Sequence, residues 1–131
     1  MGRRSGGWRA WILAAWLGVA ACGGEDPLGG LLARQEALLE LLEGHAGAPQ
    51  AAGAAAAAFM AEHGAEIAAL RAEAAARSAE DREDPRRVAR LVGEHQEALR
   101  RVGERTLALR KRDALMAEPR VRAALDAFRG L

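Results

Sequence analysis

Hydrophobic positions recur every three or four residues along most of the chain after residue 27. Leucines follow this spacing over 28–44, and a longer stripe follows it from Val88 to Met116. Such spacing places apolar side chains on one face of an α-helix and leaves charged residues on the other. The pattern therefore predicts amphipathic helices whose apolar faces need partners.

Four prolines divide this periodic region. Proline is tolerated at the first position of a helix, where the missing N–H would have no intrahelical partner. Asp26 and Asp84 precede two of the prolines as N-caps, and Gly44 favours the end of the first helix. We expect a helix start at each proline, namely Pro27, Pro49, Pro85 and Pro119. The expected helices cover residues 28–44, 50–80, 86–117 and 119–129.

The residue types favour an all-α fold. After residue 22 the chain is rich in Ala, Leu, Glu and Arg, which are strong helix formers, and poor in β-branched residues. We expect a small up-down four-helix bundle with two long central helices and two shorter ones. The expected seam of the helix over 86–117 consists of Val88, Leu91, Val92, His95, Leu99, Val102, Thr106, Leu109, Asp113 and Met116.

The connection between the two long helices has two interpretations. Helices 50–80 and 86–117 are longer than the other two, so a bundle would leave the charged turn over 79–87 projecting as a bare hairpin. Alternatively, the helix over 50–80 breaks at Gly64 and folds back, and nothing projects. The hairpin is the candidate element for contact with a partner.

The first 21 residues have the composition of an export signal. Arg3, Arg4 and Arg9 precede an apolar run over 10–21, and no acidic residue occurs before Glu25. This run is 12 residues long, whereas a membrane-spanning helix needs ~20. A cleaved signal is therefore favoured over a transmembrane helix.

Val19-Ala20-Ala21-Cys22 resembles the lipobox of bacterial lipoproteins, in which an aliphatic residue and two small residues precede a cysteine. The resemblance implies a diacylglyceryl group on the Cys22 thiol, cleavage just before it and an acyl chain on the new amino group. Residues 1–21 would then be the signal, 22–27 the lipidated cysteine and linker, and 28–131 the helical domain. Gly23 stands where an Asp would favour the inner membrane, so the resemblance implies the periplasmic face of the outer membrane.

Three other interpretations of the N-terminus remain open. One is an ordinary secretory signal with an incidental cysteine, and another is a buried N-terminal helix. The third is export by the twin-arginine route, suggested by Arg3-Arg4. The residues after this pair, S-G-G-W, lack the apolar pair usual for that route. Lipidation also explains why an exported chain carries a single cysteine, because a thioether leaves no free thiol.

Composition argues against nucleic-acid binding and against catalysis. The chain has 19 basic and 18 acidic residues, and the signal carries three of the basic ones, so the mature part has a formal charge of −2. It offers no net positive field for phosphates and keeps only Phe59 and Phe128 as aromatic residues for stacking. Ser78 and Thr106 are its only hydroxyl nucleophiles, without a G-x-S-x-G motif. We expect no catalytic residues and no enzyme activity.

His63 and His95 are weak candidates for a cofactor site, with Met60 or Met116 as softer ligands. Facing imidazoles in a helix bundle can hold a metal or haem iron. However, the chain lacks C-x-x-C-H, H-E-x-x-H and paired E-x-x-H motifs. Antiparallel registry would also leave the two histidines ~12 Å apart along the axis. We therefore expect no metal and no cofactor apart from the acyl groups on Cys22.

These patterns together predict a non-enzymatic accessory module of the bacterial envelope. Its lipid anchor would hold it to the membrane, and its helices would bind an envelope protein or another copy of the chain. The first alternative is a haem- or metal-binding bundle for electron transfer or metal storage. The second is a chaperone-like helix hairpin that holds unfolded clients.

Overall fold

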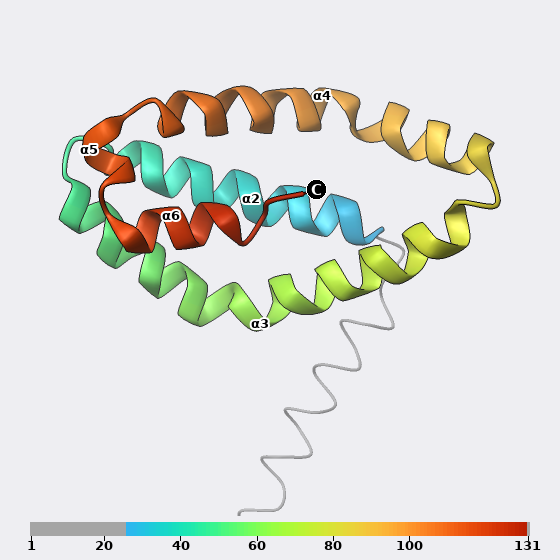
Figure 1. Ribbon diagram of the computed structural model, residues 1–131, viewed down its shortest axis with the longest axis horizontal. Coiled ribbons are helices and arrows are strands. Elements are labelled where there is room, and N and C mark those ends of the chain that lie inside the picture. Colours follow the sequence, from blue (N-terminus) through green and yellow to red (C-terminus); the bar gives the residue numbers. More distant parts are fainter. Residues whose placement is uncertain (1–25, 131) are drawn as a thin grey trace, which may run out of the picture.

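The computed structural model describes residues 26–130, and this part of the chain is all-α (Figure 1). Its helices are α2 (Pro27–Gly44), α3 (Pro49–Asp81), α4 (Pro85–Arg110), α5 (Asp113–Met116) and α6 (Pro119–Asp126). No β-strand occurs between residues 26 and 130. The all-α prediction is therefore confirmed for the described chain.

The prolines mark the helix starts, as predicted. The four helices α2, α3, α4 and α6 each have proline at the first position. Asp26 caps α2 by accepting a hydrogen bond from the N–H of Gly29 at 3.0 Å, and Asp84 caps α4 by accepting one from Arg87 at 3.3 Å. These carboxylates satisfy N–H groups that have no intrahelical partner.

The helix predicted over 86–117 is correct as far as Arg110 and wrong beyond it. It ends at Arg110, and Arg112 adopts an extended conformation with φ −89° and ψ 96°. The short helix α5 follows and places Leu115, which is 1% exposed, in the core. A straight helix would keep its side chains on one line, so this break is what allows the chain to turn towards α6.

The last predicted helix, over 119–129, is also too long, because α6 ends at Asp126. Beyond it, the carbonyl oxygens of Ala127 and Arg129 accept hydrogen bonds from the guanidinium of Arg71 at 2.5 and 2.8 Å. The arginine therefore satisfies backbone acceptors at the C-terminal end of α6, where helical carbonyls lack intrahelical donors.

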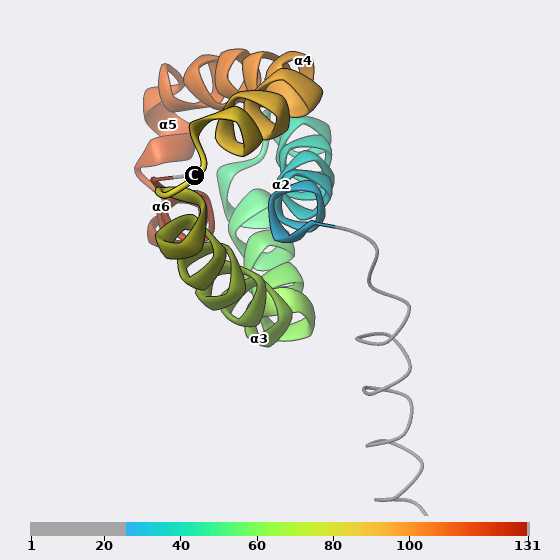
Figure 2. The same cartoon turned by 90° about the vertical axis from the view of Figure 1, so that its right-hand side faces the viewer.

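The two long helices do not lie along each other. In Figure 1, α3 and α4 form two outer arcs that meet at the turn over 82–84, while α2 and α6 lie between them. The view turned by 90° places α2 and α6 on opposite sides of the molecule (Figure 2). Helix α2 packs against both long helices, and α6 packs mainly against α3.

The core lies towards the α5 end. Helix α2 contributes four leucines that are fully buried. The first half of α3 contributes small residues and Phe59, and α6 contributes Val121 and Leu125. The leucines are Leu31, Leu38, Leu39 and Leu42. The buried apolar residues of α4, Val102 and Leu109, belong to its second half. The opposite end, where α3 turns into α4, is therefore built on much less buried apolar surface.

The predicted seam along residues 88–116 is covered over only part of its length. Val88 and Val92 are 40% and 50% exposed, although they fall on the same apolar stripe as the buried Val102.

Helix α3 runs without interruption through Gly64, so the alternative in which this helix breaks there and folds back is wrong. The turn over 82–84 instead lies at one end of the molecule (Figure 1).

Candidate binding site at the α3–α4 end

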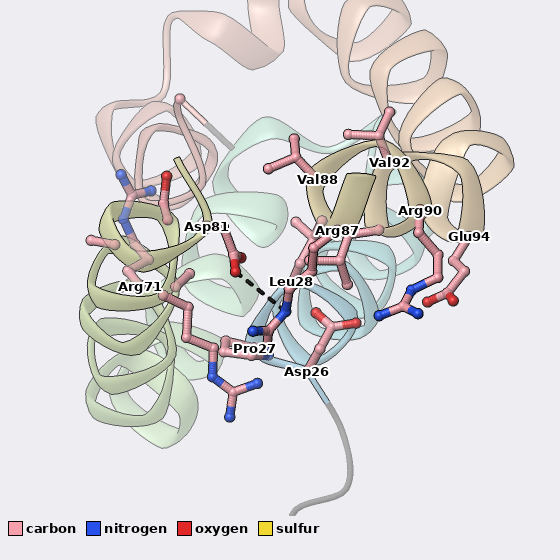
Figure 3. Close-up of a pocket in the computed structure, with 16 residues that line it drawn as sticks. Asp26, Pro27, Leu28, Arg71, Asp81, Arg87, Val88, Arg90, Val92 and Glu94 are labelled. Atoms are coloured by element: carbon pink, nitrogen blue, oxygen red, sulfur yellow. Dashed lines mark ion pairs between the residues drawn. The ribbon is translucent and has the colours of Figure 1, made fainter. Parts of the chain in front are cut away.

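A cavity of about 630 Å³ opens where α3 and α4 diverge from their turn, and we call it the end cavity (Figure 3). It is lined by the start of α2, the second half of α3, the first half of α4 and Gly130. Ligand pockets in proteins have volumes of roughly 300–1,000 Å³. The end cavity is therefore large enough to hold part of a small molecule.

Apolar side chains form much of its wall. Leu28 comes from α2, Ala74 comes from α3, and Val88, Leu91 and Val92 come from α4. The alanines of α3 are too short to reach the valines across the space, so this end of the molecule is not filled. Val88 and Val92 remain accessible for this reason and not because the helix lacks an apolar face.

Arginines from both long helices line the same cavity: Arg71 and Arg77 from α3, and Arg87 and Arg90 from α4. Arg87 forms an ion pair with the buried Asp81, with 3.3 Å between Nε and Oδ1 (Figure 3). The guanidinium of Arg71 donates to neutral carbonyl oxygens, so its charge is not cancelled by that contact. The wall thus combines apolar surface with arginines and with the carboxylates of Asp26, Asp81 and Glu94.

A short hydrogen bond also joins the start of α2 to α4 beside this cavity. His95 Nε2 and Asp26 Oδ2 are 2.5 Å apart, and both side chains are largely covered, at 20% and 25% exposure. Burial alone raises the pKa of Asp26, but hydrogen bonds from His95 and from the N–H of Gly29 outweigh it and lower that pKa. Asp26 therefore serves both as a helix cap and as a long-range contact.

We expect Asp26→Ala to lower the free energy of unfolding by about 1–2 kcal/mol near neutral pH, because both the cap and the His95 contact are lost. Because the pKa of Asp26 is lowered on folding, its stabilising contribution is present above the unfolded value, near 3.8, and is lost as pH falls through the folded value. The deficit of the variant should therefore shrink in acid. Urea unfolding of the variant and the wild type, followed by far-ultraviolet circular dichroism at neutral pH and in acid, measures this deficit.

Asp84→Ala is the matched control for this experiment. Asp84 caps α4 in the same way, is exposed, and is not paired with a histidine. Its loss should cost less than that of Asp26, at about 0.5–1 kcal/mol. Equal losses for the two variants would show that the His95 contact contributes nothing to stability.

The structure separates the two candidate cofactor histidines. His63 on α3 packs against Phe59, with ring centroids 4.7 Å apart, and lies 3.7 and 3.9 Å from carboxylate oxygens of Glu62 and Glu66. His95 instead pairs with Asp26. Within residues 26–130, no group of three or more His, Cys, Asp or Glu side chains is arranged to hold a metal ion.

The other predicted site residues have different positions. Met60 and Met116 are half-buried and pack against the hydrophobic core, one on α3 and the other on α5. Ser78 is exposed on α3, and the Thr106 hydroxyl is buried on α4. Cys22 lies outside the described residues.

Sequence reasoning did not find the end cavity. It treated the apolar stripe of α4 as a seam covered along its whole length, whereas residues 71–81 of α3 supply mostly alanine and charged side chains to the opposite wall. This shortage of large apolar residues opposite Val88 and Val92 is visible in the sequence. It was the available signal for an unfilled end.

Comparisons with protein-family models, with curated protein sequences and with solved structures find no match for this chain. Among the helices between residues 26 and 130, none is both long enough and apolar enough to cross a membrane. The function is therefore inferred from the chain's own residues and from the surfaces that they form.

Proposed function

We propose that the protein is a lipid-anchored helical module on the periplasmic face of the bacterial outer membrane. In this proposal it has no enzymatic activity and binds another envelope protein, or a second copy of itself, through the first half of α4. The lipobox resemblance at Cys22 supports the anchor. The shortage of hydroxyl and thiol nucleophiles supports a binding role over a catalytic one.

The observation that carries the binding role is the exposure of the α3–α4 hairpin. Every residue from Arg82 to Arg90 is exposed, although the same stretch begins an amphipathic helix. Its outward positions include Arg86, Ala89 and Gly93, which are exposed and do not line the end cavity. Ala89 and Gly93 carry small or no side chains, so a partner helix can approach the backbone of α4 closely on this outward side.

The anchor would keep this end of the molecule near the membrane. The described chain begins at Asp26, which lines the end cavity. The five residues from Cys22 to Asp26 span at most about 17 Å when extended. A partner bound at the hairpin would therefore also lie close to the membrane surface.

Site-specific photocrosslinking in cells tests this proposal. A photoreactive amino acid replaces Ala89 on the outer face of α4, and in the control it replaces Ala123, which is exposed on α6. We expect irradiation to produce a defined adduct of higher mass from position 89 and little or none from position 123. An adduct of twice the chain mass identifies self-association, and any other mass identifies an envelope protein. Equal labelling at the two positions, or none at position 89, would reject the hairpin as the binding surface.

A further inference from the structure

We propose that the end cavity holds one acyl chain of an anionic glycerophospholipid from the membrane that carries the anchor. This inference rests on the lipid anchor of the proposed function, which brings the cavity close to a bilayer. It concerns the inner side of α4, where Val88, Leu91 and Val92 line the cavity, whereas the proposed protein contact uses the outer side. The two surfaces can therefore be tested separately.

The volume of the cavity favours an acyl chain over a peptide helix. An α-helix with side chains is about 10 Å or more in diameter, so about 630 Å³ would hold only roughly five of its residues. An acyl chain is much thinner and can enter such a space lengthwise. Leu28, Val88 and Val92 would supply apolar contacts to its methylene groups, which favour removal from water.

The charges around the cavity favour an anionic head group. The charged lining of the cavity consists of the arginines Arg71, Arg77, Arg87 and Arg90 and the carboxylates of Asp26, Asp81 and Glu94, so arginines outnumber carboxylates by one (Figure 3). Arg77 is paired with Glu73 and Arg87 with Asp81, whereas Arg71 donates only to neutral carbonyl oxygens. Arg71 and Arg90 are therefore the cationic groups best placed to bind a phosphate. Guanidinium groups bind phosphate with two parallel hydrogen bonds, which gives them a preference for phospholipid head groups.

The position of the cavity provides a source for this ligand. Asp26 forms part of its wall, and the chain from Cys22 to Asp26 reaches at most about 17 Å. A membrane held at that distance presents phospholipids at a high local concentration. One acyl chain can thus move from the bilayer into the cavity while the phosphate binds the arginines at its edge.

The test uses the full chain, expressed as the precursor and purified from membranes, in phosphatidylcholine vesicles that contain a probe. The probe is phosphatidylglycerol with a photoreactive group near the end of one acyl chain. After irradiation and digestion, mass spectrometry should locate the label on peptides containing Leu28 and on those containing Val88 and Val92. The same probe with a phosphatidylcholine head group should label these peptides at least about fivefold less.

A double variant of the cavity wall and a matched control variant test whether the labelling is specific. The double variant Val88→Asp with Val92→Asp should reduce labelling at least about tenfold, because it places charge on the apolar wall. Both side chains are already partly exposed, so the fold should tolerate the change. The matched control is Leu107→Asp, which alters another exposed apolar residue of α4 outside the cavity and should leave labelling within about twofold. Circular dichroism confirms that each variant remains helical.

Absence of label from the cavity peptides, labelling that the double variant does not reduce, or equal labelling by both head groups would each overturn the inference. The intact mass of the same sample reports separately on the anchor. If Cys22 carries its acyl groups and the cavity is not labelled, the inference fails and the proposed function stands. If Cys22 is unmodified, the proposed function fails, and selective labelling of the cavity peptides would still support a lipid site.

Discussion

Leu39→Ala is expected to lower the free energy of unfolding by about 2–5 kcal/mol, because it leaves a cavity in the centre of the core. Leu39 is 0% exposed and lies on α2, the helix that packs against both α3 and α4. Small domains are stable by only about 5–15 kcal/mol, so this single change removes a large part of the total. Urea unfolding followed by far-ultraviolet circular dichroism is the suitable measurement, because the chain after residue 21 has no Trp or Tyr for fluorescence.

The matched control is Leu107→Ala, which removes the same atoms from a side chain that is 56% exposed. It should change the free energy of unfolding by no more than about 0.5 kcal/mol. A small loss of stability at Leu39 together with a large loss at Leu107 would mean that the Leu39 face of α2 is exposed and the Leu107 face of α4 is buried. That result would contradict the arrangement in which α2 lies between the two long helices.

Cys22→Ala is expected to abolish both the lipid modification and the processing of the precursor. The resemblance to bacterial lipoproteins makes the thiol the acceptor of the diacylglyceryl group, and alanine offers no sulfur. The variant should therefore keep Trp8, Trp11 and Trp16 and should carry no added acyl mass. Intact-mass spectrometry of the purified variant and of the wild type measures both changes.

Gly23→Asp is the matched variant for this experiment. It should retain the acyl mass and the cleavage before Cys22, but the lipoprotein resemblance implies that it shifts from the outer to the inner membrane. Separation of the two membranes by density gradient reads out the difference. A Cys22→Ala chain that is still cleaved at the same position would instead favour an ordinary secretory signal.

Helix starts could be predicted from the sequence because proline at the first helical position and a preceding Asp are local signals. The starts of α2, α3, α4 and α6 all follow this rule. The break at Arg112 could not be predicted in the same way. Residues 109–116 keep a helical spacing, and the break occurs because Leu115 is buried against distant parts of the chain.

The candidate site was predictable only in part. Asp26 could be recognised as a cap from the adjacent proline, and His95 as a residue on the apolar stripe of its helix. Their contact joins positions 69 residues apart, so it depends on how α2 lies against α4. The end cavity likewise depends on the divergence of two helices, which the sequence had suggested would lie along each other.

The central claim is that the mature chain is a lipid-anchored binding module without a cofactor. Its most direct test is to purify the protein from bacterial membranes, and to record its intact mass, ultraviolet and visible absorption and metal content on one sample. We predict the mass of a chain that begins at Cys22 and carries acyl groups, no tryptophan absorption, no visible band and no stoichiometric metal. A chain that retains its three tryptophans without acyl groups, or one with a haem band or bound metal, would contradict the claim.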